Sequence, residues 1–421
     1  NTSGMNAKTQ PSLWLKFEQI REGSEYLTYG ISPFCINGMV TADRKPQPEL
    51  WQVKHSCSPV RFHSENPVAG IFKAVNKYSF TNLNELETQW SLSKSGILAN
   101  AGTVELNVKP QSSSEFKIPV PETFDESSEY VLEISTKVKR DEPFKERGHE
   151  INFQQFVLRQ ATSFPKPAST LKYQKVFASE NDAEISIFCG DSRYRIDKQT
   201  GALNYLSGGS LLVRSMNANL WRAPISNEKV DWGKAEAEDW YRMGINVFVN
   251  TVHAIESTTA ADSSFVRVLI RSSITFPRSS DLVDNDFTYL FTSDGVVEIQ
   301  HTMTPLGYFH VEWLPCLGVS LQIPQEYNNI RWYGRGPHEN YADRNTGARL
   351  GLHRTQIDSV MLPYIEPQEY GNYSEVRWME FSDKRGKGVT ILAERPFNFS
   401  AVPNYNLDRA RYLFQLQKDQ Y

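Results

Sequence analysis

The residues best suited to chemistry lie in one loop near the end of the chain. Glu339, Asp343 and Arg344 place two acids and a cation within a few positions, beside aromatic side chains. Two glycines and a proline in the same stretch allow and fix unusual backbone angles. Such a cluster suits an array of sugar hydroxyls, and it suits a structural salt bridge equally well. Because polar clusters in loops between strands usually satisfy one another, the residues alone favour the structural interpretation.

Three stretches of the same region carry a resemblance to a known family. They read GRGPHENYADR at 334–344, PYIEPQEYGN at 363–372 and VRW at 376–378. In order and spacing they resemble the last large domain of β-galactosidases in glycoside hydrolase family 2. The resemblance implies a carbohydrate pocket bordered by Glu339, Asn340, Asp343, Arg344, Trp221 and Arg222. The last two belong to the segment LWRAP at 220–224, which the family continues with Thr-Asp-Asn-Asp, whereas this chain has Ile225-Ser226-Asn227-Glu228.

Composition predicts an all-β protein. Short bursts rich in Val, Ile, Tyr, Phe and Thr alternate with turn residues across 421 positions. The net charge of -4 comes without a basic stripe, so we expect no nucleic-acid partner. No apolar run has the length of a transmembrane helix, so we expect no membrane span.

Residues 1–51 look like a connector rather than a domain. The segment 34–51 resembles the stretch that leaves the catalytic (β/α)8 barrel of the family. The resemblance implies that Phe34 and Asn37 bind a monovalent cation such as Na⁺. The acidic partner of that site belongs to the barrel, and residues 29–33 depart from the family pattern. We therefore interpret Asn37 as structural rather than metal-binding.

Residues 52–165 predict an immunoglobulin-like β-sandwich. About seven short strands fit this length, among them 72–78, 87–92, 102–108 and 130–138. In the second of these Trp90 is expected to point inward. A Pro-containing linker at 161–170 follows.

Residues 170–421 resemble the large antiparallel super-sandwich of the family, which also recurs in galactose mutarotases. One helix is expected from Trp232 to Met243. The family continues with further strands after the equivalent of 412–414, so we expect this domain to be incomplete at its end.

Glycoside hydrolysis needs two carboxylates held about 5 Å apart. The resemblance places both on barrel strands, and no carboxylate of this chain matches either role, so we predict no catalytic residue here. Mutarotase-like chemistry lacks a convincing pair of histidine and acid.

The leading interpretation is a non-catalytic subunit or fragment that forms part of the sugar pocket. It would assemble with a barrel-bearing polypeptide or with further copies of this chain.

The alternative is a secreted binding or carrier protein that reuses the β-galactosidase scaffold. Asn-x-Ser/Thr sequons at Asn1, Asn372 and Asn398 lean towards a secreted glycoprotein, although such sequons also arise by chance. Free thiols are preferred over disulfides for the cysteines, which lack metal-ligand spacing; they are Cys35, Cys57, Cys189 and Cys316.

Overall fold

The computed structural model describes residues 39–41, 44–161, 174–229, 235–307, 309–360, 362, 364, 367–403 and 407. The predicted cation ligands Phe34 and Asn37, the sequon at Asn1 and the linker prolines Pro165 and Pro167 lie outside these residues. Strands dominate the described part of the chain, which confirms the all-β prediction.

Seven strands form an immunoglobulin-like sandwich of two antiparallel sheets, ordered β1-β2-β5 and β4-β3-β6-β7. Their bounds are β1 Val60–His63, β2 Ile71–Asn76, β3 Leu86–Lys94, β4 Ile97–Val104, β5 Ser112–Lys117, β6 Tyr130–Val138 and β7 Glu150–Arg159. Alternate residues of β3 are buried, and Trp90 points inward as predicted, with 6% of its surface exposed.

The strand expected at 102–108 runs instead from Ile97 to Val104. Ser95 and Gly96 both have positive φ, 48° and 80°, and they close a two-residue hairpin that pairs Lys94 with Ile97. The turn therefore sets the register of β4, and the strand ends before the predicted one does.

The later strands form three antiparallel sheets, ordered β17-β12-β11-β10-β9-β8, β13-β14-β15-β16 and β19-β18-β20-β21. The first contains β8 Val176–Glu180, β9 Glu184–Cys189, β10 Ser192–Asp197, β11 Leu203–Ser207, β12 Ser210–Asn219 and β17 Gly318–Gln322. The second contains β13 Val249–Thr259, β14 Phe265–Thr275, β15 Leu282–Thr292 and β16 Val297–Leu306. The third, called the middle sheet below, contains β18 Asn329–Gly336, β19 Arg349–Gln356, β20 Asn372–Ser382 and β21 Gly388–Ser400.

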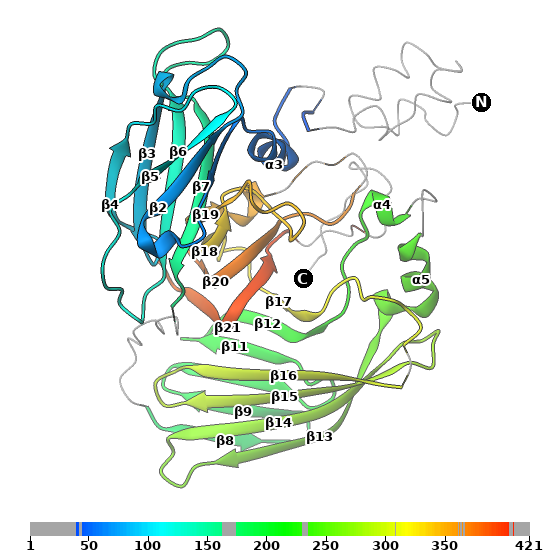
Figure 1. The fold of residues 1–421 in the computed structure, drawn as a ribbon. Coiled ribbons are helices and arrows are strands. Elements are labelled where there is room, and N and C mark those ends of the chain that lie inside the picture. The colour runs from blue at the N-terminus through cyan, green and yellow to red at the C-terminus, as the bar shows by residue number, and fades with distance from the viewer. Residues whose placement is uncertain are drawn as a thin grey trace, which may run out of the picture.

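The middle sheet lies between the sandwich and the other two sheets (Figure 1). Because successive residues of a strand point to opposite faces, β18 contributes side chains to the contact with the sandwich on one face and to the large core on the other. Trp332, which is fully buried, joins the large core formed with β8–β16. Tyr333, 1% exposed, packs with Leu350 against Val131 of the sandwich.

A buried ion pair joins the middle sheet to the sandwich. Arg377 of β20 donates from Nε and Nη2 to the two carboxylate oxygens of Glu129, at 3.0 and 2.7 Å. The Tyr333 hydroxyl donates to the same carboxylate at 2.6 Å. Gln155 adds two bonds to the backbone of Leu350.

A helix that the sequence did not predict, α3 (Pro48–Ser56), lies beside this junction. The predicted boundary between residues 51 and 52 falls inside it. Gln52 accepts a bond from the Gly347 amide at 2.8 Å. A Cβ at Gly347 would come within 2.7 Å of the Gln52 Cα, so the absent side chain allows the helix to approach this closely.

Two further helices belong to the second part of the chain. The predicted helix at 232–243 appears as α5 (Glu236–Met243), which ends at Gly244 with φ 85°. The short α4 (Ser226–Lys229) precedes it, and residues 230–234 are outside the description.

Cys57, Cys189 and Cys316 carry free thiols. Among the described residues, no helix has the length and apolar character that crossing a membrane requires.

We predict that Arg377→Met destabilises the chain by about 3–5 kcal/mol, because it leaves the Glu129 carboxylate buried without its partner. Urea unfolding, followed by tryptophan fluorescence, measures the change. Arg331→Met is the matched control, since Arg331 pairs with Glu380 at the surface and should cost at most about 1 kcal/mol. Equal losses for the two variants would contradict the assignment of the ion pair as a main connection.

Candidate functional site

The loop that follows β18 holds Glu339 in a buried position. One carboxylate oxygen accepts a hydrogen bond from Arg344 Nη2 at 2.5 Å, and the other accepts one from the Gly371 amide. Only 5% of the residue is exposed. Burial raises the pKa of Glu339, while the bonds from Gly371 and Arg344 oppose that rise.

Asn340 fastens the loop to β20. Its amide nitrogen donates to the carbonyl oxygens of Arg335 and His338, and its side-chain oxygen accepts from the amide and hydroxyl of Ser374. Its backbone exchanges two further bonds with Asn372. All of its polar atoms are used within the protein, so Asn340 positions the loop and has no atom left for the ligand contact that the resemblance implied.

Arg344 and Asp343 separate in the structure. Arg344 pairs with Glu339, lies 3.4 Å from Glu49 of α3, and stands over the ring of Tyr341 at 4.9 Å. Asp343 is exposed, and no hydrogen bond or ion pair within the described part of the chain involves it. The sequence grouped the two residues because they are adjacent, but the turn directs them differently.

Trp221 and Arg222 form the opposite side of the cluster. Arg222 makes a two-pronged pair with Glu228, at 2.8 and 2.6 Å, and its guanidinium lies 5.5 Å from the Trp240 ring centre. Trp221 packs on Tyr241 at 5.3 Å. Glu228, which belongs to the altered motif at 225–228, is therefore the ion-pair partner of Arg222. The sequence did not predict this role.

Glu369 lies between these two sides and is the most perturbed acid of the site. Burial raises its pKa to about 7, with Arg222 opposing the rise and Glu339 adding to it. Its carboxylate also accepts a 3.4 Å bond from Ser400. A carboxyl group that exchanges its proton near neutral pH can serve as donor or acceptor to a ligand hydroxyl.

Two buried polar atoms of the cluster have no hydrogen bond in the described structure. They are the hydroxyl of Tyr341 and one carboxylate oxygen of Glu49. Burial raises the pKa of Tyr341, so its hydroxyl keeps its proton at neutral pH. Such unpartnered atoms are rare and often mark a place for water or ligand. The arrangement as a whole suits the binding of a neutral polar molecule.

The described sequons differ in their surroundings. Asn372 donates its side-chain nitrogen to the Asn340 carbonyl at 2.7 Å, so the atom that a glycan would occupy is already engaged. Asn398 lies exposed on β21. In the described part of the chain, no group of three or more His, Cys, Asp or Glu is arranged to hold a metal ion.

Sequence reasoning found no pair of histidine and acid, yet the structure contains one. His310 lies 2.7 Å from Asp281, which is nearly buried. Burial raises the pKa of Asp281, but hydrogen bonds from Ser279 and His310 outweigh it and hold the pKa below its usual value. The two residues are 29 positions apart, and no local pattern links them. They lie outside the cluster around Glu369.

Comparison with known proteins identifies both halves of the described chain. A family model described as "Beta galactosidase small chain" matches residues 189–421, and one described as "Beta-galactosidase, domain 4" matches residues 72–159. A β-galactosidase of Priestia megaterium is 28% identical over 395 residues, 91% of this chain and 37% of the relative. One of Halalkalibacterium halodurans is 27% identical over 418 residues, 95% of this chain and 40% of the relative. The chain thus spans about two fifths of the length of these relatives.

We predict that Glu369 makes stability fall as pH rises. Folding lifts its pKa from 4.5 to about 7, so the folded chain binds the proton more tightly, and this advantage is lost between those pH values. Relative to wild type, Glu369→Gln should gain about 3 kcal/mol in unfolding free energy between pH 4.5 and pH 8. Urea unfolding at both pH values tests this, with Glu394→Gln at an exposed position of β21 as control. Parallel pH curves for wild type and Glu369→Gln would refute it.

Proposed function

The chain belongs to the β-galactosidase small-chain family, and we propose that it is the non-catalytic C-terminal part of a β-galactosidase, forming one wall of the carbohydrate pocket. The observation that carries this proposal is the cluster around Glu369. Three separate segments converge there, at 220–228, 339–344 and 367–371, and they leave the Tyr341 hydroxyl unpartnered.

The cluster suits a sugar because its own charges are already paired. Arg222 is held by Glu228, and Arg344 by Glu339. Neither guanidinium is therefore free to attract an anion, and the hydroxyls of a neutral ligand find Glu369 and Tyr341 as partners. Trp221 and Tyr241 add aromatic surface of the kind that lines small-molecule sites.

The proposal assigns bond cleavage to another part of the enzyme. The family resemblance places both catalytic carboxylates on a barrel, and the relatives are well over twice as long as the matched region. Within the cluster, the Glu339 carboxylate accepts hydrogen bonds from Arg344 and from the Gly371 amide. These bonds suit a structural role better than nucleophilic attack. The chain then supplies ligand contacts and assembly contacts.

The proposed partner is a barrel-bearing polypeptide that packs near α3. Apolar side chains gather there with large exposed fractions, 39% for Met39, 44% for Val40 and 36% for Val53. Exposed apolar residues beside a connector mark a surface suited to protein contact. Further copies of this chain are the alternative occupant of that surface.

A secreted carrier protein built on the same scaffold is the second candidate. The altered motif at 225–228 favoured it, because two family acids are replaced there. In this chain Glu228 forms an ion pair with Arg222, so the altered motif still organises the site and is weaker evidence for a lost function.

We predict that the isolated chain does not hydrolyse a chromogenic β-galactoside between about pH 5 and pH 9. Combined with a barrel-bearing polypeptide of the family, it should support turnover. In that complex Glu369→Gln should raise KM about tenfold with little change in kcat, because a wall contact binds substrate and transition state alike. Turnover by the isolated chain that persists through repurification would defeat the proposal.

We also predict association near α3, measured by sedimentation velocity. Val53→Asp should weaken the complex with the barrel-bearing polypeptide at least tenfold, because it buries a charge in an apolar contact. Val247→Asp, on the 50%-exposed Val247 that precedes β13, is the matched control. Self-association lost only with Val53→Asp would point to copies of this chain, and an unchanged complex would reject this surface.

A further inference from the structure

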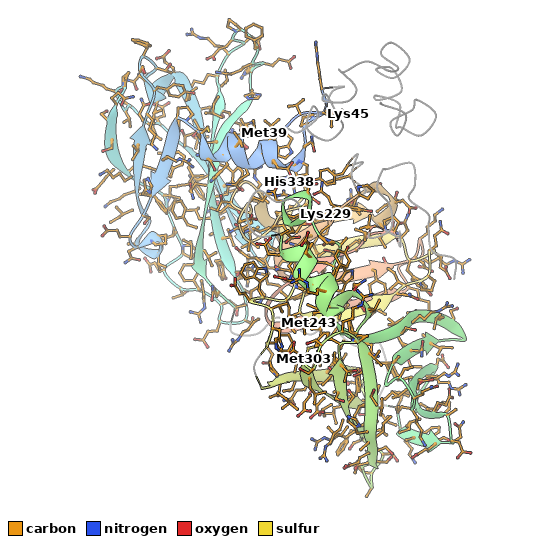
Figure 2. The ribbon with its side chains drawn as sticks, turned by 90° about the vertical axis from the view of Figure 1, so that its right-hand side faces the viewer. Met39, Lys45, Lys229, Met243, Met303 and His338 are labelled. Carbon is orange, nitrogen blue, oxygen red and sulfur yellow. The ribbon has the colours of Figure 1, made fainter. Side chains whose placement is uncertain are left out.

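A cavity lies outside the cluster around Glu369. It has a volume of about 220 Å³ and opens where α3, the start of β7 and two segments of the middle sheet meet. Figure 2 shows His338, one of its lining residues, beside α3. The cavity is smaller than the roughly 300–1,000 Å³ of sites for drug-sized molecules, so it fits one small ring.

Aromatic side chains form one wall of this cavity. The rings of Trp51 and His338 are 6.1 Å apart and tilted by 32°, and Trp51 keeps 40% of its surface exposed. Phe153, which also lines the cavity, is covered by the guanidinium of Arg349 at 3.9 Å. The partly exposed Trp51 thus offers a flat apolar face, against which the C–H face of a ring can pack.

Two deeply buried polar side chains of the lining each have one polar atom without a hydrogen bond in the described structure. Asn152 is 3% exposed. Its side-chain nitrogen donates to the Val60 carbonyl at 2.8 Å, and its side-chain oxygen has no partner in the described structure. His55, 8% exposed, has an Nδ1 without a partner there. Burial lowers the pKa of His55 to about 4, so it is neutral at pH 7 and offers both a donor and an acceptor. An unsatisfied group of this kind costs about 1–3 kcal/mol, so the wall of the cavity is a polar environment that is incompletely hydrogen-bonded.

The two cationic side chains of the lining, Lys54 and Arg349, face carboxylates. Arg349 bonds to both Glu133 and Glu150, and Lys54 faces Glu150 as well. Two cations therefore meet two carboxylates, and an added anion would compete with Glu150 for them. This balance favours an uncharged ligand with several hydroxyls over a phosphate or a carboxylate.

The cavity is also preformed. Gln52 ties α3 to the Gly347 amide and to the Thr346 hydroxyl, both at 2.8 Å. Arg349 ties β19 to the sandwich through its two carboxylate partners. Little ordering is left for a ligand to impose, which favours measurable affinity for a small molecule.

We propose that this cavity binds a single neutral pyranose ring, as a second carbohydrate site distinct from the cluster around Glu369. Trp51 packs on the ring face, and the ring hydroxyls bond to Lys54 and His55. The site contributes binding rather than chemistry, holding a sugar or the end of an oligosaccharide at the junction of the two domains.

Isothermal titration calorimetry with methyl β-D-galactopyranoside and methyl β-D-glucopyranoside tests the proposal on the full chain. At least one glycoside should bind with a Kd on the order of a millimolar, as expected for one ring. Trp51→Ala should weaken binding at least tenfold. Trp313→Ala, which removes another exposed tryptophan (48% exposed), should leave it unchanged. D-galacturonate, the anionic comparison, should bind at least tenfold more weakly.

Hydrogen exchange of the wild-type chain locates the site without relying on a variant. The bound glycoside should slow amide exchange in α3 and at residues 151–153, and not at 221–229. Protection confined to 221–229, with binding lost in Glu369→Gln and kept in Trp51→Ala, would place the sugar at the first cluster and overturn the proposal. Tighter binding of galacturonate, or no binding of either glycoside at about 20 mM, would overturn it too.

Discussion

The architecture depends on one buried ion pair, between Arg377 of β20 and Glu129 of the sandwich. Both side chains are almost fully buried, and the Tyr333 hydroxyl completes the hydrogen bonding of the carboxylate. A buried pair adds little net stability over apolar side chains, but removing one member is costly. We infer that it contributes registry here, because it joins the middle sheet to the sandwich at a defined point, and the cavity and α3 lie at the contact between the same two parts.

Because the middle sheet is held in one position on the sandwich, the site residues that it carries are held in position too. One of its faces belongs to the large core and the other to the sandwich, so its strands cannot shift without disturbing both. The loop that follows β18 is therefore held in a fixed position as well. Asn340 then clamps the loop to β20 through Asn372 and Ser374, which brings Glu339 within reach of the Gly371 amide. A few fixed bonds thus set the distance between the loop and Glu369.

The sequence predicted features that repeat locally. Alternation in β3 placed Trp90 inside, and the bounds of β6 agree with its apolar run. Motif order also located the loop around Glu339. Pairings between distant residues carried no local signal, and Arg377 lies 248 positions from Glu129. The direction of Asp343, the ion pair of Glu228 and the docking of α3 depend on tertiary contacts, so they required the structure.

Helix α3 connects the two proposed sites physically. Its Glu49 lies beside Arg344 in the cluster around Glu369, whereas its Trp51 and His55 line the cavity. Consecutive loop residues divide in the same way, because His338 faces the cavity and Glu339 faces the cluster. A displacement of α3 would therefore change the partners of Arg344 and the shape of the cavity together. If the proposed barrel-bearing partner packs near this helix, its binding would bias both sites through one element, which is the physical requirement for coupling between them.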